Sequence, residues 1–398
     1  MHGTSHDIVS TVPATNHAIV LRVFDEDFWP SRIDDPLPAS DDLEPKRCLR
    51  NTIGAFSRPQ SRSLTWFKKL TGADEESPDQ VRRELKIDDD CIVCPNGNRI
   101  AFGHLETPKL SELRETVSGL NRQAGTLAIR EVIADVRQLH ADATNANALF
   151  QVASQFNLLE MTGPTVTPER GVGIYQYDHT QGPSCAIACG AGTIYRNYFA
   201  PVGDAIGQST SRQIDCSSDL GQRLGNLNGN LWMMENGYLF PSDGGLDKIA
   251  TRLQSSTKDE LDQLRGELRI GLQWNAEVTL PEVSLAGAAH RVSQAYCSAL
   301  PVAYGRQPKD EWAEFAKLVL DAAYEATLCA GIINAERTGN RIVYLTLLGG
   351  GVFGNRDAWI IDAIERSLTR YRDFDIDVTI VSYRRPNHKV AELVSRFR

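Results

Sequence analysis

The stretch that most constrains the fold of this chain is RIVYLTLLGGGVFGNRDAWIIDAI, residues 341–364. An apolar run leads into three glycines, and an amphipathic pattern follows from about Arg356 to Arg370. This order predicts a strand, a glycine-rich loop and a helix of an α/β sheet. In such a turn Gly349, Gly350 and Gly351 can adopt positive φ and expose backbone N–H groups, close to the positive end of the helix dipole.

Two interpretations of this turn remain open from the stretch alone. It can hold an anion such as phosphate, or it can be a tight connection that binds nothing. The spacing GGGVFG is not that of a Walker A loop, because no Gly-Lys-Ser/Thr follows, and it is not GxGxxG.

Length and composition limit the classes of function. The chain has 398 residues, enough for one large domain with insertions or for two domains, and its 41% apolar and 23% charged residues are those of an ordinary globular protein. The net charge of −9 argues against generic binding to nucleic acid or to anionic membranes. We see no signal peptide and no apolar run of about 18 residues, so we expect a soluble protein of the cytoplasm.

The eight cysteines are scattered and predict reduced core thiols rather than a disulfide framework. Only Cys91 and Cys94 form a CxxC pair, and it lacks the second pair or the histidines of a zinc site. We therefore expect no metal.

The composition and residue patterns of the sequence suggest three parts. Residues 1–62 read as an irregular leader rich in Pro, Asp and Ser. Residues 63–126 read as a small α+β lobe, with a helix start at Ser77-Pro78, a hairpin turn at Asn96-Gly97 and a helix from Lys109 to Ala124. Residues 127–398 have the texture of an α/β domain, with a charged surface helix near residues 257–270, a long core helix from about 311 to 337 and a final strand at 375–385.

A second junction precedes the glycine-rich one in the chain. The apolar run NALFQVAS ends in the polar residues Gln155, Asn157 and Glu160. Because ligands of open α/β sheets gather at the carboxyl ends of strands, these side chains are candidates for a site. The alternative is that Gln155 and Asn157 only satisfy the backbone of a loop.

The loop that follows carries Asp178, Thr180, Gln181 and Gly182, and then Pro183 begins a helix of small residues. Asp178 lies among polar and small residues rather than on a charged helix face, which makes it a candidate catalytic carboxylate. The structural alternative for Asp178 is an N-cap or an Asx-turn.

Taken together, residues 127–385 resemble an enlarged macrodomain, the α/β/α fold that binds ADP-ribose. The strand ending in Asn157, the loop and small-residue helix TQGPSCAIACGAG, the loop Gly351-Val352-Phe353-Gly354, and Tyr383 after a last strand follow the order of that family. The first loop departs from it, because TQGP replaces the usual run of glycines. GHLETPKLSELR, QFNLLE, YQYDHTQGP and CSALPVAY also resemble a macrodomain-type group that includes bacterial effectors removing ADP-ribose from ubiquitin.

The resemblance implies a three-layer α/β/α mixed sheet with insertions and an ADP-ribosyl hydrolase that needs no cofactor. The implied partners are ADP-ribose and an ADP-ribosylated protein, with ubiquitin and an arginine linkage as candidates, in the cytoplasm or in a host cytosol. A non-catalytic ADP-ribose-binding module is the alternative, and a nucleotide phosphatase or a scaffold of the same fold also stays open.

The implied catalytic residues are Asp178 first and Glu160 second, either of which would stabilise an oxocarbenium-like state or activate a water. The glycine-rich loop would hold the diphosphate under Phe353. Gln155, Asn157 and Gln181 would hold ribose hydroxyls, Thr180 would position the water and Tyr383 would lie near the adenine. The implied ligand-binding set is Gln155, Phe156, Asn157, Thr180, Gln181, Gly182, Gly349, Gly350, Gly351, Val352, Phe353, Gly354, Asn355 and Tyr383.

Overall fold

A computed structural model describes residues 64–120, 125–281 and 289–397. These described residues belong to one compact unit. The predicted leader over residues 1–62 lies outside the described residues.

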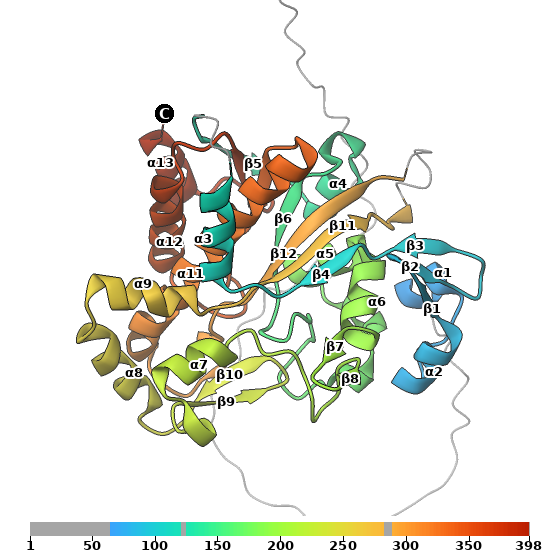
Figure 1. The fold of residues 1–398 in the computed structure, drawn as a ribbon, viewed down its shortest axis with the longest axis horizontal. Coiled ribbons are helices and arrows are strands. Elements are labelled where there is room, and N and C mark those ends of the chain that lie inside the picture. Colours follow the sequence, from blue (N-terminus) through green and yellow to red (C-terminus); the bar gives the residue numbers. More distant parts are fainter. Residues whose placement is uncertain (1–63, 121–124, 282–288, 398) are drawn as a thin grey trace, which may run out of the picture. The chain divides into compact units, whose positions relative to one another are not determined.

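A seven-stranded mixed sheet forms the centre of this unit, in the order β4-β11-β12-β6-β13-β14-β5 (Figure 1). The strands β12, β6, β13, β14 and β5 run parallel to one another, and β11 and β4 extend the sheet antiparallel at one edge. The strands are β4 His104–Glu106, β5 Ala128–Ile133, β6 Leu149–Ala153, β11 Gly271–Glu277, β12 Arg291–Cys297, β13 Ile342–Leu345 and β14 Asp377–Ser382. The central strands β6 and β13 are apolar along most of their length, because helices cover both of their faces.

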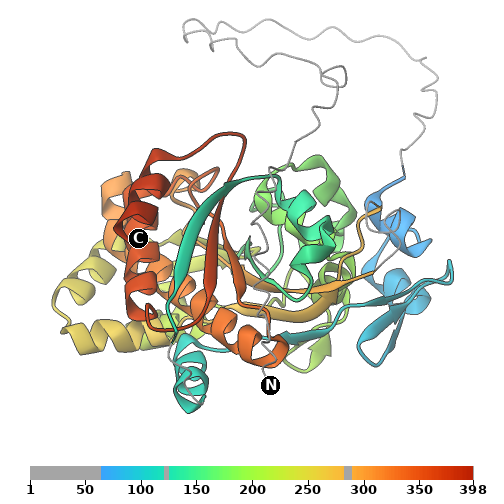
Figure 2. The ribbon, with the colours of Figure 1, turned by 90° about the horizontal axis from the view of Figure 1, so that it is seen from above.

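Helices cover the two faces of the sheet, so the fold is a three-layer α/β/α arrangement (Figures 1 and 2). One layer holds α4 Val136–Ala141, α5 Gln181–Ala188 and α6 Gly190–Tyr198. The other holds α3 Leu110–Gly119, α11 Ala313–Thr338, α12 Asp357–Arg370 and α13 His388–Arg396. The helix α13 follows the strand that the sequence suggested as the last element.

The long helix α11 is buried on almost every side, and not only along the predicted stripe. By length and composition, the segment Lys309–Thr338 that contains it is the one segment of the described residues that could cross a membrane, and 89% of its most apolar window is buried inside the protein. Burial of that extent is what the core helix of a three-layer fold requires.

The first part of the described chain holds α1 Trp66–Thr71, α2 Pro78–Glu84 and a small antiparallel sheet of β1 Lys86–Asp88, β2 Cys91–Val93 and β3 Arg99–Ala101. The predicted helix start is confirmed, since the Ser77 side chain accepts from the backbone N–H of Gln80. The hairpin is confirmed too, with Gly97 at φ +88° in its turn.

Part of the lobe predicted over residues 63–126 contributes to the large sheet. Strand β4 belongs to the edge of the large sheet, and α3 packs on α11. The residues predicted as a lobe are therefore joined to the large sheet and to α11 by contacts that were not visible in the sequence.

A long insertion between α6 and β11 contributes β7 Pro201–Val202, β8 Ala205–Ile206, α7 Ser218–Leu224, the hairpin β9 Trp232–Glu235 and β10 Tyr238–Pro241, α8 Gly245–Gln254 and α9 Lys258–Gly266. The helix α9 was expected to be a solvated surface helix. Its Arg265 instead pairs with Asp321, and its Asp262 with Arg114 and Arg366. These arginines belong to a network around Glu325, whose side chain is fully buried.

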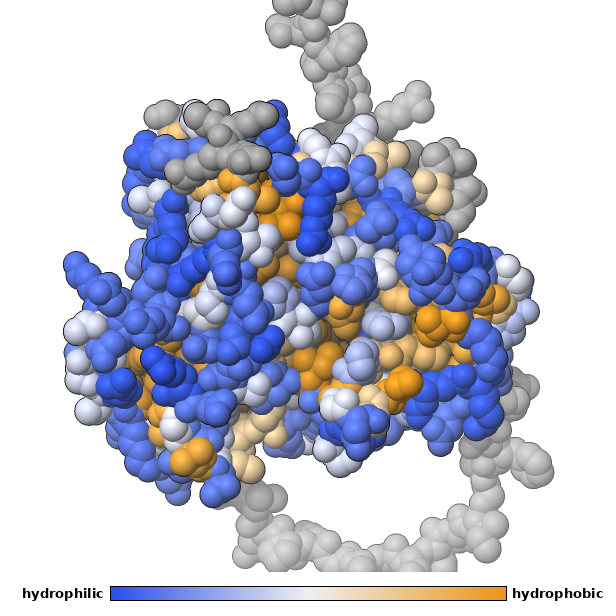
Figure 3. Space-filling view, viewed as in Figure 1, coloured by the Kyte–Doolittle hydropathy of each residue, from blue (hydrophilic) through white to orange (hydrophobic). Residues whose placement is uncertain are grey.

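Short 3₁₀ segments complete the described elements. They are η1 Ala143–Asn145, η2 Pro168–Arg170, η3 Gly173–Tyr177, η4 Leu227–Gly229, η5 Val302–Tyr304 and η6 Lys309–Trp312. On the face shown in Figure 3, polar side chains predominate and apolar ones form separate patches between them.

Candidate functional site

A cavity of about 320 Å³ opens where β12, β6 and β13 end. These three strands are parallel neighbours, so the loops that leave their carboxyl ends meet at one edge of the sheet. The loop after β12 contributes Ala299 and Tyr304 to the lining. The loop after β6 contributes Ser154, Gln155 and residues 160–162, and the loop after β13 contributes residues 346–349 and 351–353. The two junctions that the sequence singled out are therefore brought together in space.

The loop after β6 is held by its own amide side chains. Gln155 accepts from the backbone N–H of Met161 at 3.0 Å and donates to the Met161 carbonyl at 3.3 Å. Asn157 accepts from the backbone N–H of Leu159 and donates to Gln213 at 2.8 Å. Gln155 lines the cavity and Asn157 is fully buried outside it. The alternative interpretation, in which these residues satisfy a loop backbone, describes their contacts.

Glu160 closes this loop and lines the cavity while being only 2% exposed. Neither carboxyl oxygen has a hydrogen-bond partner within the part of the chain that the structure describes. The nearest cation is the guanidinium of Arg196, with 3.9 Å between Nη2 and Oε1. Burial raises the pKa of Glu160 to about 8, and the charge of Arg196 opposes this shift. The site therefore contains a carboxyl group that changes its charge near neutral pH.

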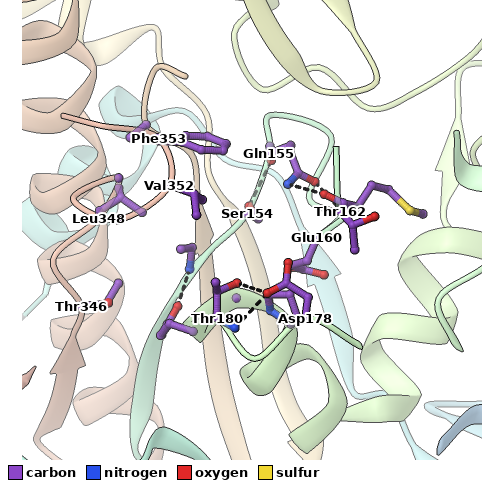
Figure 4. A pocket seen from close by; sticks show the side chains of 18 of the residues that line it. Ser154, Gln155, Glu160, Thr162, Asp178, Thr180, Thr346, Leu348, Val352 and Phe353 are labelled. Atoms are coloured by element: carbon purple, nitrogen blue, oxygen red, sulfur yellow. Dashed lines mark hydrogen bonds between the residues drawn. The ribbon is translucent and has the colours of Figure 1, made fainter. Parts of the chain in front are cut away.

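Asp178 lines the same cavity and is partly buried. Its Oδ1 accepts from the backbone N–H of Thr180 at 2.9 Å and from the Thr180 hydroxyl at 2.6 Å, which is an Asx-turn at the entrance to α5. Figure 4 shows Asp178 and Glu160 on one side of the cavity, across from Val352 and Phe353.

The first turn of α5 forms another part of the lining, through Gln181, Gly182 and Pro183. The Gln181 side chain accepts from the backbone N–H of Ala153 at 2.9 Å and donates to the Gln151 carbonyl at 2.8 Å, so its amide is used to cap β6. Gly182 packs directly against the carboxyl end of β6. A Cβ on it would lie 2.0 Å from the Ala153 carbonyl oxygen and 3.2 Å from Cγ of Glu160.

The glycine-rich loop supplies the opposite wall through Gly349, Gly351, Val352 and Phe353. The backbone N–H groups of these four residues donate to no acceptor among the described residues. Gly349 has φ +73°, as the sequence suggested, whereas Gly350 and Gly351 keep negative φ. Backbone N–H groups that have no partner among the described residues are able to hold an anion if they face the cavity.

The rest of this loop supports it from outside the lining. Asn355 is buried and donates to the carbonyls of Leu300 and Gly349, and Gly354 packs at φ +72° against Ala303. Gly350 also lies outside the lining, as does the whole of α12. Of the two helix N-termini that the sequence suggested, that of α5 contributes to the lining and that of α12 does not.

Two more predicted ligand-binding residues lie outside the lining. Phe156 is 2% exposed and belongs to the hydrophobic core. Tyr383 follows β14, one strand beyond β13 from the cavity, and is 61% exposed.

An aromatic cluster at the cavity includes two residues that were not predicted. Tyr238 of β10 and Tyr304 pack with Phe353, with ring centroids 5.4 to 5.8 Å apart. The Tyr238 hydroxyl donates to the Met161 carbonyl at 3.0 Å. No sequence signal connects the β9–β10 hairpin with the strand ends, because the contact arises only when the insertion folds over them.

The electrostatics of the cavity are one-sided. Glu160 and Asp178 are the only acidic residues in its described lining, which holds no Lys, Arg or His. In the described ranges no group of three or more His, Cys, Asp or Glu residues could hold a metal ion, and the seven described cysteines are free and buried.

No family model and no curated protein matches this chain. Among solved structures, it is similar to the poly(ADP-ribose) glycohydrolase of Thermomonospora curvata, at 14% identity over 81% of this chain and 96% of that chain, with a TM-score of 0.40. It is also similar to the poly(ADP-ribose) glycohydrolase of Deinococcus radiodurans in complex with ADP-ribose, at 14% identity over 74% and 92%, with a TM-score of 0.38. We infer no activity from likenesses of this degree.

Proposed function

We propose that this chain is an ADP-ribosyl hydrolase that removes ADP-ribose from arginine residues of modified proteins. One observation carries the proposal. One cavity combines two carboxyl groups at one side with four backbone N–H groups at the other that have no partner among the described residues. A ligand with a diphosphate and a sugar beyond it fits this separation of charge, in keeping with the macrodomain resemblance of the sequence.

The glycine-rich wall would hold the diphosphate. Its donors are backbone N–H groups, which are fixed in place and need no lysine or arginine. Phe353 would lie against the ligand with Tyr238 and Tyr304 behind it. The ribose whose C1″ bond to the modified protein is cleaved would then extend toward Glu160 and Asp178.

The absence of cationic side chains from the described lining favours an arginine linkage. A guanidinium is planar, positively charged and rich in donors, and the carboxylate of Asp178 in the cavity lining is a suitable acceptor for it. A substrate that presented a carboxylate or a further phosphate here would meet two acidic groups.

The same linkage suggests the chemistry. The bond from C1″ to the guanidinium nitrogen breaks, its electron pair stays with nitrogen, and a neutral guanidine leaves an oxocarbenium-like ribose. No acid is needed, because the leaving group already carries the positive charge. A base is needed for the attacking water, and Glu160 would accept its proton while the water oxygen bonds to C1″. A carboxylate with a pKa near 8 is a stronger base than an ordinary one.

The test uses the full chain with proteins that carry arginine-, serine- or glutamate-linked ADP-ribose, and free ADP-ribose is measured by mass spectrometry. We expect release from arginine, and a loss of at least about 100-fold in Glu160→Gln and Asp178→Asn. Glu115→Gln serves as the control, since Glu115 is exposed on α3 and does not line the cavity.

Ubiquitin is included beside an unrelated arginine-modified protein, because we propose ubiquitin as one substrate. Equal rates on the two would remove ubiquitin as the preferred one. Release from none of the linkages, with both variants equal to wild type, would overturn the proposal. Calorimetric binding of ADP-ribose without any turnover would establish the binding module in its place.

A further inference from the structure

We propose that Arg196 is a positioning residue that holds the Glu160 loop in place and sets how readily the Glu160 carboxyl group gives up its proton. The inference deepens the proposed function, because it concerns how the charge of the proposed base is controlled. Arg196 does not line the cavity and would not touch the substrate.

The Arg196 side chain is fully buried and each of its nitrogens has a partner within reach. Nε donates to the Leu158 carbonyl at 3.0 Å, Nη1 to Oε1 of Gln273 at 3.3 Å and Nη2 to the Thr193 hydroxyl at 3.1 Å. The guanidinium carbon lies 3.6 Å from the centre of the Tyr296 ring. The cation is therefore held rigidly from α6, β11 and β12.

One of these contacts fixes the backbone of the loop that carries Glu160. Leu158 has φ +62°, a conformation that a leucine rarely adopts, and Arg196 bonds its carbonyl. On the other side of Leu158, Gly271 leaves room for its side chain, since a Cβ there would lie 2.5 Å from Leu158 Cδ1. Leu158 is two residues before Glu160, so the hydrogen bond from Arg196 to the Leu158 carbonyl helps to fix the backbone that places Glu160 at the cavity.

The other relation is electrostatic. Arg196 stands 3.9 Å from Glu160, too far for a hydrogen bond but close enough for charge attraction in a buried site. The other titratable groups that influence Glu160 or face it are Tyr175 of η3, Cys185 of α5, Tyr296 of β12 and Asp178. The Tyr175 hydroxyl is occupied by the Glu160 backbone N–H at 3.0 Å and leaves the carboxyl oxygens unpaired. Arg196 is the one cation among these groups.

The arrangement has a clear consequence for the charge of Glu160. A direct hydrogen bond from Arg196 would keep the Glu160 carboxylate ionised, while the complete absence of a nearby cation would keep Glu160 protonated far above neutral pH. A cation held near the carboxyl group without bonding it places the titration between these limits. The carboxyl oxygens of Glu160 also have no hydrogen-bond donor among the described residues.

The test compares folding stability across pH in the full chain. Wild type, Glu160→Gln, Arg196→Met and the double variant are unfolded with denaturant at steps from about pH 4 to about pH 10. The stability difference within each pair that differs only at Glu160 reports the titration of that carboxyl group. We expect its midpoint to lie about one pH unit or more higher when Arg196 is replaced by Met, a change of at least about tenfold in acidity.

Arg269→Met is the matched control, because Arg269 bonds a backbone carbonyl as Arg196 does, while its carboxylate partner is Asp219 and not Glu160. The control should leave the Glu160 midpoint unchanged. If Arg196→Met does not fold, Arg196→Lys is used, whose compact ammonium cannot keep all the contacts of the planar guanidinium; its midpoint should move in the same direction by a smaller amount. An unchanged midpoint in the variant that folds would overturn the proposal and leave Arg196 a structural residue.

Hydrolysis gives a separate readout. The rising limb of the pH profile of kcat/KM on an arginine-linked substrate should move to higher pH in Arg196→Met. This shift should accompany the shift of the Glu160 midpoint measured by folding stability. A limb that stays in place while the folding midpoint moves would overturn the link between Arg196 and the reaction. If wild type hydrolyses no substrate, the proposed function fails, and the folding experiment still decides whether Arg196 controls Glu160.

Discussion

Replacing Glu160 by Gln is expected to stabilise the folded chain at alkaline pH while it removes the proposed activity. In the folded state burial raises the pKa of Glu160 from 4.5 to about 8. Below pH about 4.5 the carboxyl group is protonated in both the folded and the unfolded chain and gives no pH dependence. As pH rises from there to about 8, the unfolded chain ionises and the folded chain does not, so stability is lost over this window.

The size of the loss follows from the shift. One pKa unit corresponds to about 1.36 kcal/mol, so a shift of about 3.5 units corresponds to about 5 kcal/mol of unfolding free energy at pH above about 8. The Glu160→Gln variant does not titrate at this position. Its advantage over wild type should therefore be smallest near pH 4, grow through neutral pH and level off at about 5 kcal/mol above pH about 8.

The assay is denaturant unfolding at fixed pH, followed by circular dichroism. Glu115→Gln is the control, and its difference from wild type should not follow this window, since Glu115 is exposed. A Glu160→Gln variant whose stability runs parallel to that of wild type at every pH would refute the reasoning. So would an advantage that appears only in acid.

Three further predictions concern the other parts of the cavity. Gly349→Ala should lower the melting temperature and weaken ADP-ribose binding at least about tenfold, because the new Cβ would lie 2.4 Å from Cβ of Ala299 at a φ of +73°. Gly351→Ala is the control. Its Cβ would have no atom within 4 Å, so its melting temperature should be nearly that of wild type. Saturating wild type with ADP-ribose at about 100 times its Kd should stabilise the fold by about 2.7 kcal/mol, and no shift in calorimetry would count against the ligand. Tyr383→Ala should change the Kd for ADP-ribose by less than about twofold, because Tyr383 lies outside the cavity and is exposed; a larger loss in titration calorimetry would restore its predicted place at the adenine.

The sequence was informative wherever neighbours in the chain decide the outcome. The Ser77-Pro78 helix start, the Asn96-Gly97 hairpin and the strand, loop and helix over residues 341–370 depend on local propensities, and the structure has all three. It also indicated that the loops after β6 and β13 meet, because parallel strands present their carboxyl ends at one edge.

Other features depended on contacts between distant segments. The sequence could not show that Gln181 caps β6, that Tyr238 reaches the cavity from an insertion, or that Arg196 stands beside Glu160. It treated Glu160 as second to Asp178, because the exposure of a carboxyl group cannot be read from its neighbours in the chain. Burial, the absence of donors and a cation at 3.9 Å are properties of the packed structure.

By itself, then, the sequence determined the α/β class, the two strand-to-helix junctions and the two candidate carboxylates, since periodicity, glycine placement and loop chemistry are local. Only the tertiary structure decided which of those groups face the cavity, which helix begins there and how strongly Glu160 holds its proton. The physical reason is that solvation and electrostatic interaction act through space. A group such as Glu160 acquires its chemistry from residues far away in the chain.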